Sequence, residues 1–215
     1  MTGLSDADLA PGVHLARRDE DVVVLDLRSD AYILIPGAAD LLQPVRHGGG
    51  VQAETAFLDQ LAAAGLVVPA SDGRRRPLVP AKRQAALNLS APPFRRLPLF
   101  LHALAATAAF RRRGLAALVE TAARRKARTR RRDLEAAIRE AAAFETIRPW
   151  APFEGDCLQR SWMLHDRLCR RGLEADWVFG VRTWPFFAHC WVQVGDVVVG
   201  DSLNRVGGFT PIMAV

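Results

Sequence analysis

A cysteine, a histidine and an aspartate in the C-terminal part of the chain have the types needed for thiol-nucleophile chemistry. Cys157 follows Asp156, a suitable helix N-cap, and Gly172 is a suitable C-terminal stop. The first turn of such a helix favours a thiolate, and its unpaired N–H groups can receive an oxyanion. His189 and Asp201 lie on the two arms of the predicted hairpin "FFAHCWVQVGDVVVGDS". They would act as the base and as the group that orients it.

The other cysteines and histidines fit this chemistry less well. Taken alone, even Cys157 has an ordinary interpretation as a small core residue. Cys169 falls in the last turn of the same predicted helix, where the helix dipole disfavours a thiolate. Cys190 adjoins His189 and so points to the opposite face of its strand. Both are predicted to pack. His165, about 80° around the helix from Cys157, is a weaker partner. The remaining histidines are assigned to the N-terminal module or to packing: His14, His47 and His102.

The register of the hairpin decides whether His189 and Asp201 can meet. Residues that oppose each other across an antiparallel pair share a face of the sheet. A two-residue turn that begins at Gly195 opposes Cys190, rather than His189, to Asp201. The pair therefore requires an odd-numbered loop or a bulge, which Gly195 or Gly200 would supply.

Length, cysteine content and hydropathy restrict the class of protein. The 215 residues are half hydrophobic, enough for the core of one large domain or two small ones. Three cysteines without metal-ligand spacing argue for a reducing cytoplasm and against a disulfide scaffold; no metal or other bound cofactor is expected. The N-terminus lacks a signal-peptide pattern, and no apolar run is long enough to cross a bilayer, so no membrane partner is expected.

Charge divides the chain into three parts. Residues 1–70 carry four Lys and Arg against ten Asp and Glu, residues 71–150 carry 19 against six, and residues 151–215 carry six against seven. Within the basic part, 124–132 ("RRKARTRRR") is interpreted as a solvated helix face or loop, or as a dock for an acidic partner. No aromatic interleaving supports nucleic acid as that partner.

The predicted elements give an α+β chain with two domains. Residues 1–70 predict three strands followed by helices over 37–50 and 52–67, in a winged-helix-like arrangement, with Gly65 as a helix stop and one more strand over 66–68. Residues 71–95 are interpreted as a basic, Pro-rich linker. A C-terminal domain then covers 96–215, helical over 96–150 and with the catalytic core in 151–215.

The motifs of the two ends resemble known families. "GDCLQRSWMLHDRLCRRG", a strand and "AHCWVQVGDVVVGDS" are similar to transglutaminase-like (papain-like) cysteine peptidases, and most to the leader peptidases of lasso-peptide biosynthesis. The N-terminal module resembles the leader-recognition element of that pathway, which in many bacteria is a separate chain. The resemblance covers most of residues 10–70 and 150–215.

This resemblance implies cleavage of a precursor peptide at its leader–core junction by Cys157, with His189 as base and then acid and Asp201 orienting it. The leader would add a strand to the edge of the N-terminal sheet. An ATP-dependent lasso cyclase is the expected further partner, and the sequence does not tell whether cleavage needs ATP. The expected leader-binding residues are Tyr32, Ile33, Leu34, Ile35, Phe57 and Leu61.

Three points stay open in the sequence. Papain-like enzymes have a glutamine ahead of the cysteine, but "RPWAPFEG" has none, so the Cys157 N–H or the indole of Trp150 would hold the oxyanion. Acyl transfer to an amine would use the same triad. A non-catalytic adaptor that binds peptide or nucleic acid is the third interpretation.

Overall fold

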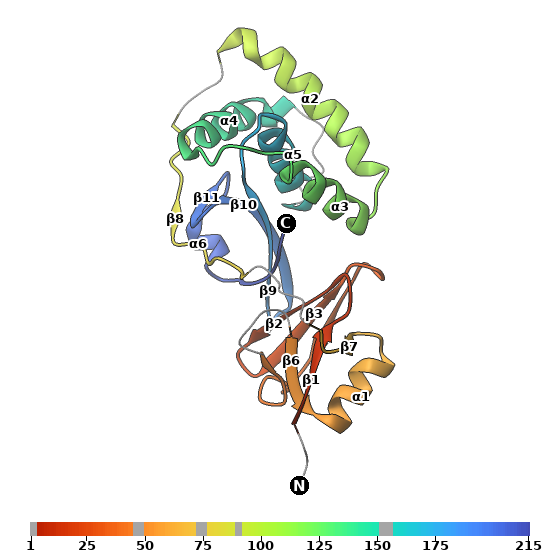
Figure 1. Ribbon diagram of the computed structural model, residues 1–215. Helices are drawn as coiled ribbons and strands as arrows, with labels where there is room; N and C mark the ends of the chain where they lie inside the picture. The colour runs from red at the N-terminus through yellow and green to blue at the C-terminus, as the bar shows by residue number, and fades with distance from the viewer. Residues whose placement is uncertain (1–3, 45–49, 72–76, 89–91, 151–156) are drawn as a thin grey trace.

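The structure is a computed structural model that describes residues 4–44, 50–71, 77–88, 92–150 and 157–215. Three β-sheets and a layer of helices make up this part of the chain (Figure 1). The long helices of residues 93–170 lie at one end, the two N-terminal sheets with the helix of residues 55–63 at the other, and the C-terminal sheet between them. The chain is therefore mixed α and β, as predicted. None of the helices in the described ranges has both the length and the apolar character needed to cross a membrane.

The N-terminal region contains two sheets where the sequence predicts one. The three expected strands form the antiparallel sheet β2-β3-β4, with the bounds Val13–Arg18, Asp21–Asp26 and Ala31–Ile35. The second sheet has the order β5-β6-β1-β7 and the bounds Gln43–Pro44, Gly50–Glu54, Leu4–Leu9 and Val67–Pro69. Helix α1, Thr55–Ala63, is followed by Gly65, whose φ of 71° suits glycine at a helix end.

The helix predicted over 37–50 is wrong in the described part of that range. Residues 38–41 include turns, and Gln43–Pro44 is strand β5. Pro44 has no backbone N–H for a helix interior, and Leu42 is buried in the N-terminal core instead. α1 is the only helix that the structure describes before residue 92, so a winged-helix-like set of helices is not confirmed.

The C-terminal sheet has the strand order β12-β9-β10-β11-β8. Its main strands β9 to β12 have the bounds Asp176–Arg182, Phe187–Val194, Val197–Val199 and Thr210–Ala214. Strand β8, Arg83–Gln84, pairs parallel with β11 at the edge of this sheet. Part of the segment interpreted as a linker therefore belongs to the sheet, because its backbone pairs there.

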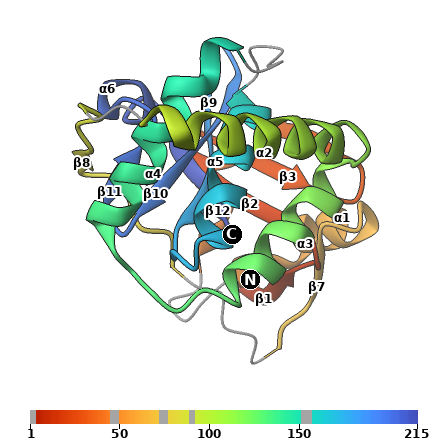
Figure 2. The same ribbon diagram turned by 90° about the horizontal axis from the view of Figure 1, so that it is seen from above.

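Helices cover both faces of the C-terminal sheet. The long helices α2, α3, α4 and α5 lie on one face (Figure 2) and have the bounds Pro93–Arg111, Leu115–Lys126, Leu134–Ile147 and Cys157–Arg170. Between α4 and α5 lies the 3-10 helix Arg148–Trp150. On the other face, the short helix α6, Leu203–Val206, packs on Trp191 and Val178. Alternate residues of β10 face opposite layers: the His189 ring lies beside the Trp191 ring, whereas Cys190 belongs to the core that includes the long helices.

The three-stranded sheet of the N-terminal region is shared between two cores. Val22 and Val24 of β3 face the N-terminal core together with α1. Val23 and Leu25 of the same strand belong to the large core that includes Trp177 and the long helices. The N-terminal region is thus packed onto the C-terminal sheet through buried side chains rather than joined to it by the chain alone.

Candidate active site

Helix α5 brings Cys157 to the C-terminal sheet. The helix begins at Cys157, while the predicted cap Asp156 lies outside the described residues. At the other end, Gly172 has a φ of 74°, and its N–H donates to the Cys169 carbonyl at 2.9 Å, which confirms the predicted stop. Trp162, fully buried, anchors α5 in the core. Cys157 therefore lies where the helix has unpaired N–H groups.

His189 of strand β10 packs against aromatic side chains. It pairs in register with Gly180 of β9. A Cβ atom at Gly180 would lie 2.7 Å from the Trp191 ring, so only glycine leaves room for that ring. The His189 ring lies 6.2 Å from the Trp191 ring and 5.2 Å from the Phe209 ring, between centroids. These contacts hold the imidazole in one place.

Asp201 reaches His189 because the chain leaves the strand at Gly200. The hairpin is regular: Val194 pairs with Val197 across a two-residue turn at Gly195. Continued to Asp201, this register would oppose it to Cys190 and not to His189. β11 ends before Gly200, whose φ is 79°. A Cβ atom there would lie 2.7 Å from a methyl group of Leu164, so Gly200 is required both by its conformation and by space. The predicted odd-numbered loop or bulge is therefore wrong: the register of the paired residues does not shift, and Asp201 reaches His189 because it lies beyond the end of β11, after the turn at Gly200.

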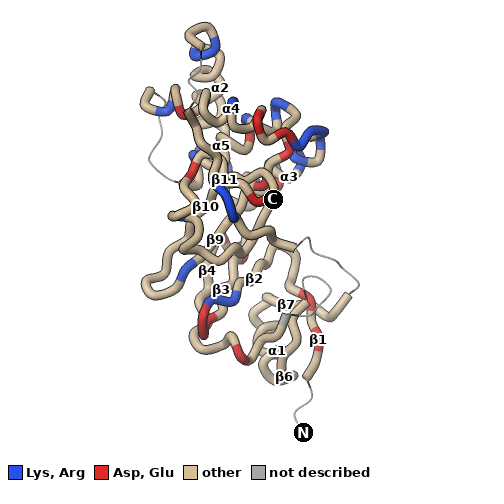
Figure 3. The backbone as a smooth tube through the Cα atoms, turned by 90° about the vertical axis from the view of Figure 1, so that its left-hand side faces the viewer, with Lys and Arg blue, Asp and Glu red and all other residues tan. Residues whose placement is uncertain are grey.

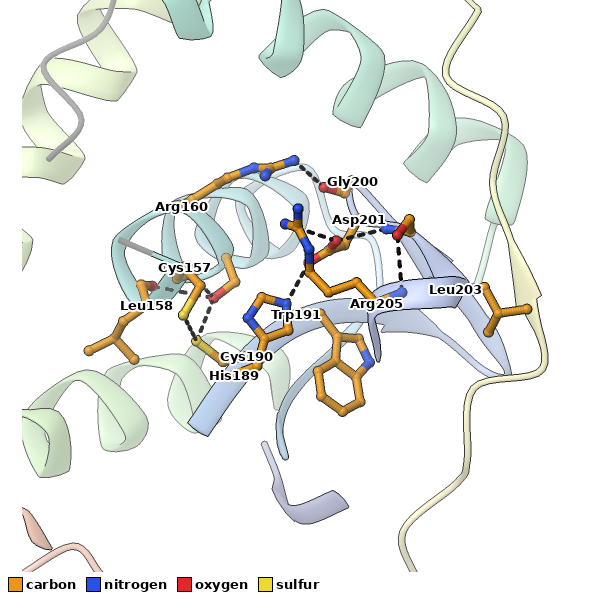
Figure 4. Close-up of polar contacts among 12 residues, drawn as sticks. Cys157, Leu158, Arg160, His189, Cys190, Trp191, Gly200, Asp201, Leu203 and Arg205 are labelled. Carbon is orange, nitrogen blue, oxygen red and sulfur yellow. Dashed lines mark hydrogen bonds and ion pairs between the residues drawn. The ribbon is translucent and has the colours of Figure 1, made fainter. Parts of the chain in front are cut away.

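The three predicted catalytic residues lie at one pocket (Figure 4). His189 Nε2 and Asp201 Oδ2 are 2.7 Å apart, and the Ser202 N–H donates to Asp201 Oδ1 at 2.7 Å. Arg160 of α5 donates to the Gly200 carbonyl and so fixes the turn that carries Asp201. Because Nε2 faces Asp201, Nδ1 is the ring nitrogen left for Cys157.

The pKa values of the site favour a thiolate beside an imidazolium. Hydrogen bonds with Cys190 and His189 lower the pKa of Cys157 from 9.0 to about 5, although burial opposes them. Burial alone would lower the pKa of His189, but hydrogen bonds with Asp201 and Cys157 outweigh it and raise the pKa to about 9. The pKa of Asp201 is lowered against the effect of burial, chiefly by its hydrogen bond with His189. Between these two pKa values Cys157 is charged and nucleophilic.

Cys190 packs in the large core, as predicted, and it also lines the pocket beside Cys157. Its Sγ atom lies 3.8 Å from Cys157 Sγ and 3.3 Å from the Ser161 hydroxyl. Cys190 does point away from the Trp191 face of β10, but α5 lies on that other side. The sequence could show the alternation of β10 but not which layer the helix would occupy.

The predicted oxyanion donor Trp150 lies away from this pocket. Its side chain is 78% exposed and is not among the residues that line the pocket. The Cys157 N–H at the start of α5 is the better placed of the two predicted donors. Within the described ranges, no three His, Cys, Asp or Glu side chains are grouped to hold a metal ion.

The predicted leader-binding residues are divided by the fold. Strand β4 is an edge strand of its sheet, as expected, and Ile33 is 39% exposed there. Tyr32 and Leu34 instead pack against the large core. Ile35 and Phe57 lie at the rim of the N-terminal core, and Leu61 is buried inside it. Helix α1 packs on β1, β6 and β7, so it does not form a groove wall with Leu61 turned outward.

Fold and site together describe a papain-like arrangement, in which a helix-borne cysteine faces a histidine of a sheet and an aspartate that follows the last residue of a strand. Residues 100–214, more than half of the chain, match the transglutaminase-like superfamily, and the chain belongs to that superfamily. Over 52 residues the chain is 46% identical to the microcin J25-processing protein McjB of Escherichia coli. That match covers 24% of this chain and 25% of the length of McjB. No solved structure matches the chain.

Proposed function

We propose that this protein is a cysteine peptidase that removes the leader of a ribosomally made precursor during lasso-peptide maturation. The observation that carries the proposal is the 2.7 Å contact between His189 and Asp201 in the pocket that Cys157 lines. Membership of the transglutaminase-like superfamily and the partial identity to a microcin-processing protein support it.

In the proposed mechanism the Cys157 thiolate attacks the carbonyl carbon of the leader–core bond. The carbonyl oxygen gains the negative charge and is held by N–H groups at the start of α5. His189, which is protonated at rest, gives its Nδ1 proton to the departing amine. The C–N bond breaks, the core peptide leaves with a free N-terminus, and the leader remains as a thioester on Cys157.

Hydrolysis then restores the enzyme. Neutral His189 takes a proton from a water molecule, whose oxygen attacks the thioester carbonyl. The C–S bond breaks, and the leader leaves with a new carboxylate. Asp201 stays ionised throughout and accepts a hydrogen bond from the Nε2–H of His189. It stabilises the imidazolium, which is present at rest and forms again when His189 takes the proton from water.

The N-terminal region would supply substrate recognition. An edge strand offers unpaired backbone groups to an extended peptide, and β4 is such a strand. Because Val23 and Leu25 of the neighbouring strand are part of the large core, removing residues 1–70 would expose that core. Recognition is therefore better tested by a point change. Ile33→Glu should raise KM for the precursor and leave kcat nearly unchanged. Val68→Glu, at the edge of the other sheet and 37% exposed, should change neither KM nor kcat.

The decisive experiment is cleavage of a precursor peptide encoded near the gene of this protein, followed by mass spectrometry. We expect one cut at the leader–core junction, no dependence on a metal, and no cut by Cys157→Ala. Mixing in an ATP-dependent cyclase tests that expected partner and shows whether cleavage needs ATP. Processing by Cys157→Ala at the wild-type rate would instead favour a non-catalytic adaptor.

A further inference from the structure

Cys190 is a second thiol in direct contact with the proposed nucleophile, and the mechanism above gives it no role. Its side chain is 4% exposed and belongs to strand β10, directly below the start of α5. The Ser161 hydroxyl donates toward Cys190 Sγ at 3.3 Å, and the Cys190 S–H group donates to Cys157 Sγ at 3.8 Å. A thiol has one proton to donate, and this one is directed at Cys157.

Ser161 has other hydrogen-bond partners besides Cys190. The Trp177 Nε1–H donates to the Ser161 oxygen at 2.8 Å, and the Ser161 hydroxyl is within 2.7 Å of the Cys157 carbonyl. The Ser161 oxygen thus already accepts one strong hydrogen bond. Once Cys157 is a thiolate it is a charged acceptor, and charge-assisted hydrogen bonds are about twice as strong as neutral ones.

We propose that Cys190 is a positioning residue for the reaction: its S–H group donates to the Cys157 thiolate and holds that sulfur over His189. The role rests on the proposed function, since it matters only if Cys157 is the nucleophile. A hydrogen bond from Cys190 is also the largest cause that lowers the pKa of Cys157. The donor is lost on deprotonation of Cys190, so it must remain a thiol.

The test is the rate of Cys157 alkylation by iodoacetamide as a function of pH, read by mass spectrometry of the labelled peptide. Cys190→Ala and Cys190→Val both remove the donor, and Cys190→Ser keeps one. We expect the alkylation midpoint to move upward by about one pH unit in the first two, which means roughly fivefold less thiolate near pH 5. Cys190→Ser should stay near wild type.

This readout needs no precursor, so it separates the role of Cys190 from the proposed function. Cys190→Ala and Cys190→Val differ in size, so the test still works if one of them does not fold. Circular dichroism shows whether each variant is folded. Midpoints in a folded donor-free variant that superimpose on wild type overturn the proposal. A shift equal in Cys190→Ser and Cys190→Val also overturns it, because packing alone would then explain the effect.

A separate observation concerns helix α2, which is apolar on two opposite faces. Leu99, Ala103 and Ala106 are buried against the other helices. The opposite face carries large apolar side chains that are 38% to 78% exposed: Phe94, Leu97, Leu101 and Leu104. Helices that are apolar all round are normally buried all round, and α2 lies at the outer surface (Figures 1 and 2). One face therefore lacks its cover.

Spacing and charge define what would cover it. The four exposed side chains follow steps of three, four and three residues and span about 80° of the helix. This is the narrow seam of a two-helix contact rather than the wide face of a membrane-surface helix. Residues 92–113 carry five Arg and no Asp or Glu, and of these Arg95 pairs with Glu140; basic residues gather on this layer (Figure 3). A second copy of α2 would bring like charges together.

We infer that the exposed seam of α2 binds an acidic amphipathic helix of a partner protein. The probe for a test is a four-heptad synthetic helix with leucine at positions a and d and glutamate at e and g. Fluorescence anisotropy should show binding that weakens with salt and is lost in Leu97→Ser/Leu101→Ser. Leu41→Ser, at an exposed leucine elsewhere, is the matched control.

The competing occupants are outcomes of the same experiment. A probe with lysine in place of glutamate should not bind. Equal binding of both probes, no binding of either, capture by anionic vesicles instead of the acidic probe, or dimerisation of the free protein in sedimentation would each overturn this inference. Wild-type alkylation of Cys157 in the seam variant shows that its fold is intact.

Discussion

Helix α5 carries the cysteines of two cysteine–histidine pairs whose pKa values are shifted in opposite directions. At its start, Cys157 meets His189 of the sheet; near its end, Cys169 Sγ lies 3.5 Å from Nε2 of His165 on the same helix. The first pair has one member with its pKa lowered to about 5 and one raised to about 9. In the second pair, burial raises the pKa of Cys169 to about 12 and lowers that of His165 to about 4.

The two pairs differ in pKa because one histidine has a carboxylate partner and borders solvent, and the other has neither. His189 is paired with Asp201 and borders an open pocket. His165 is fully buried, stacks on Trp177, and has the Ala175 carbonyl as its hydrogen-bond partner. Its nearby cations further disfavour a positive ring. The same two residue types thus form an ion pair or a neutral packed pair, according to burial and to whether a carboxylate touches the imidazole.

The largest expected contrast is in catalysis. Cys157→Ala or His189→Ala should reduce precursor cleavage by about 10³-fold or more, because both lose a group that touches the reacting atoms. Cys169→Ala should change it by less than about threefold. Single-turnover rates measured by mass spectrometry provide the comparison. A folded Cys169→Ala protein as inactive as Cys157→Ala would reverse the assignment of the two pairs.

Removing the carboxylate should make the first pair resemble the second. Asp201→Asn is expected to lower kcat by about 10²- to 10⁴-fold, because the imidazolium loses its counter-charge and its tautomer is no longer fixed. KM should change little. Asp196→Asn, at the exposed turn of the same hairpin, is the control. Equal kcat values for the two variants would contradict a role for Asp201.

The pH dependence distinguishes the pairs without any substitution. The Cys157 thiolate is lost as pH falls through about 5, and the His189 proton is lost as pH rises through about 9. Cleavage should therefore be bell-shaped with these two limbs. Iodoacetamide should label Cys157 at pH 7 and leave Cys169 unlabelled in the folded protein, since the pKa of Cys169 is near 12. Equal labelling of both cysteines would contradict this.

Substitutions in the buried pair, Cys169 and His165, should have the smallest effect on activity. They should have a larger effect on stability than substitutions in the first pair. His165→Ala removes a fully buried ring and its contact with Trp177. It should lower the free energy of unfolding by about 2–4 kcal/mol. His189→Ala should lower it by less than His165→Ala does, because the His189 ring borders a pocket. Urea denaturation of both variants tests the order.

Prediction from sequence succeeded where the signal is local. The strands β2, β3 and β4, the end of α5 at Gly172 and the helical stretch over α3 and α4 follow from turn residues and from hydrophobic spacing. It failed where a distant partner decides. Residues 83–84 look like a linker because their strand is short, and they become β8 only when β11 lies beside them.

The segment 124–132 shows the same limit. Its charges predict a solvated face, yet Lys126 contacts Asp176 and the Val215 carbonyl, and Arg132 pairs with Glu174 at 2.6 Å. These acidic partners are far away in sequence, so the pattern of the segment alone cannot reveal them. Part of the charge of 124–132 therefore forms ion pairs inside the fold, and only the rest contributes to the charge of the surface.

By itself the sequence determined the chemical types at the site and their order along the chain: a cysteine at a helix start, a histidine in a strand and an aspartate after a glycine. Only the tertiary structure decided which of them meet. Gly200 turns the chain out of a regular hairpin and so brings Asp201 to His189. Packing of α5 on one face of β10 also made Cys190 a neighbour of Cys157. Residue type and spacing are local properties, whereas the face of a sheet that a helix covers depends on how the whole core packs.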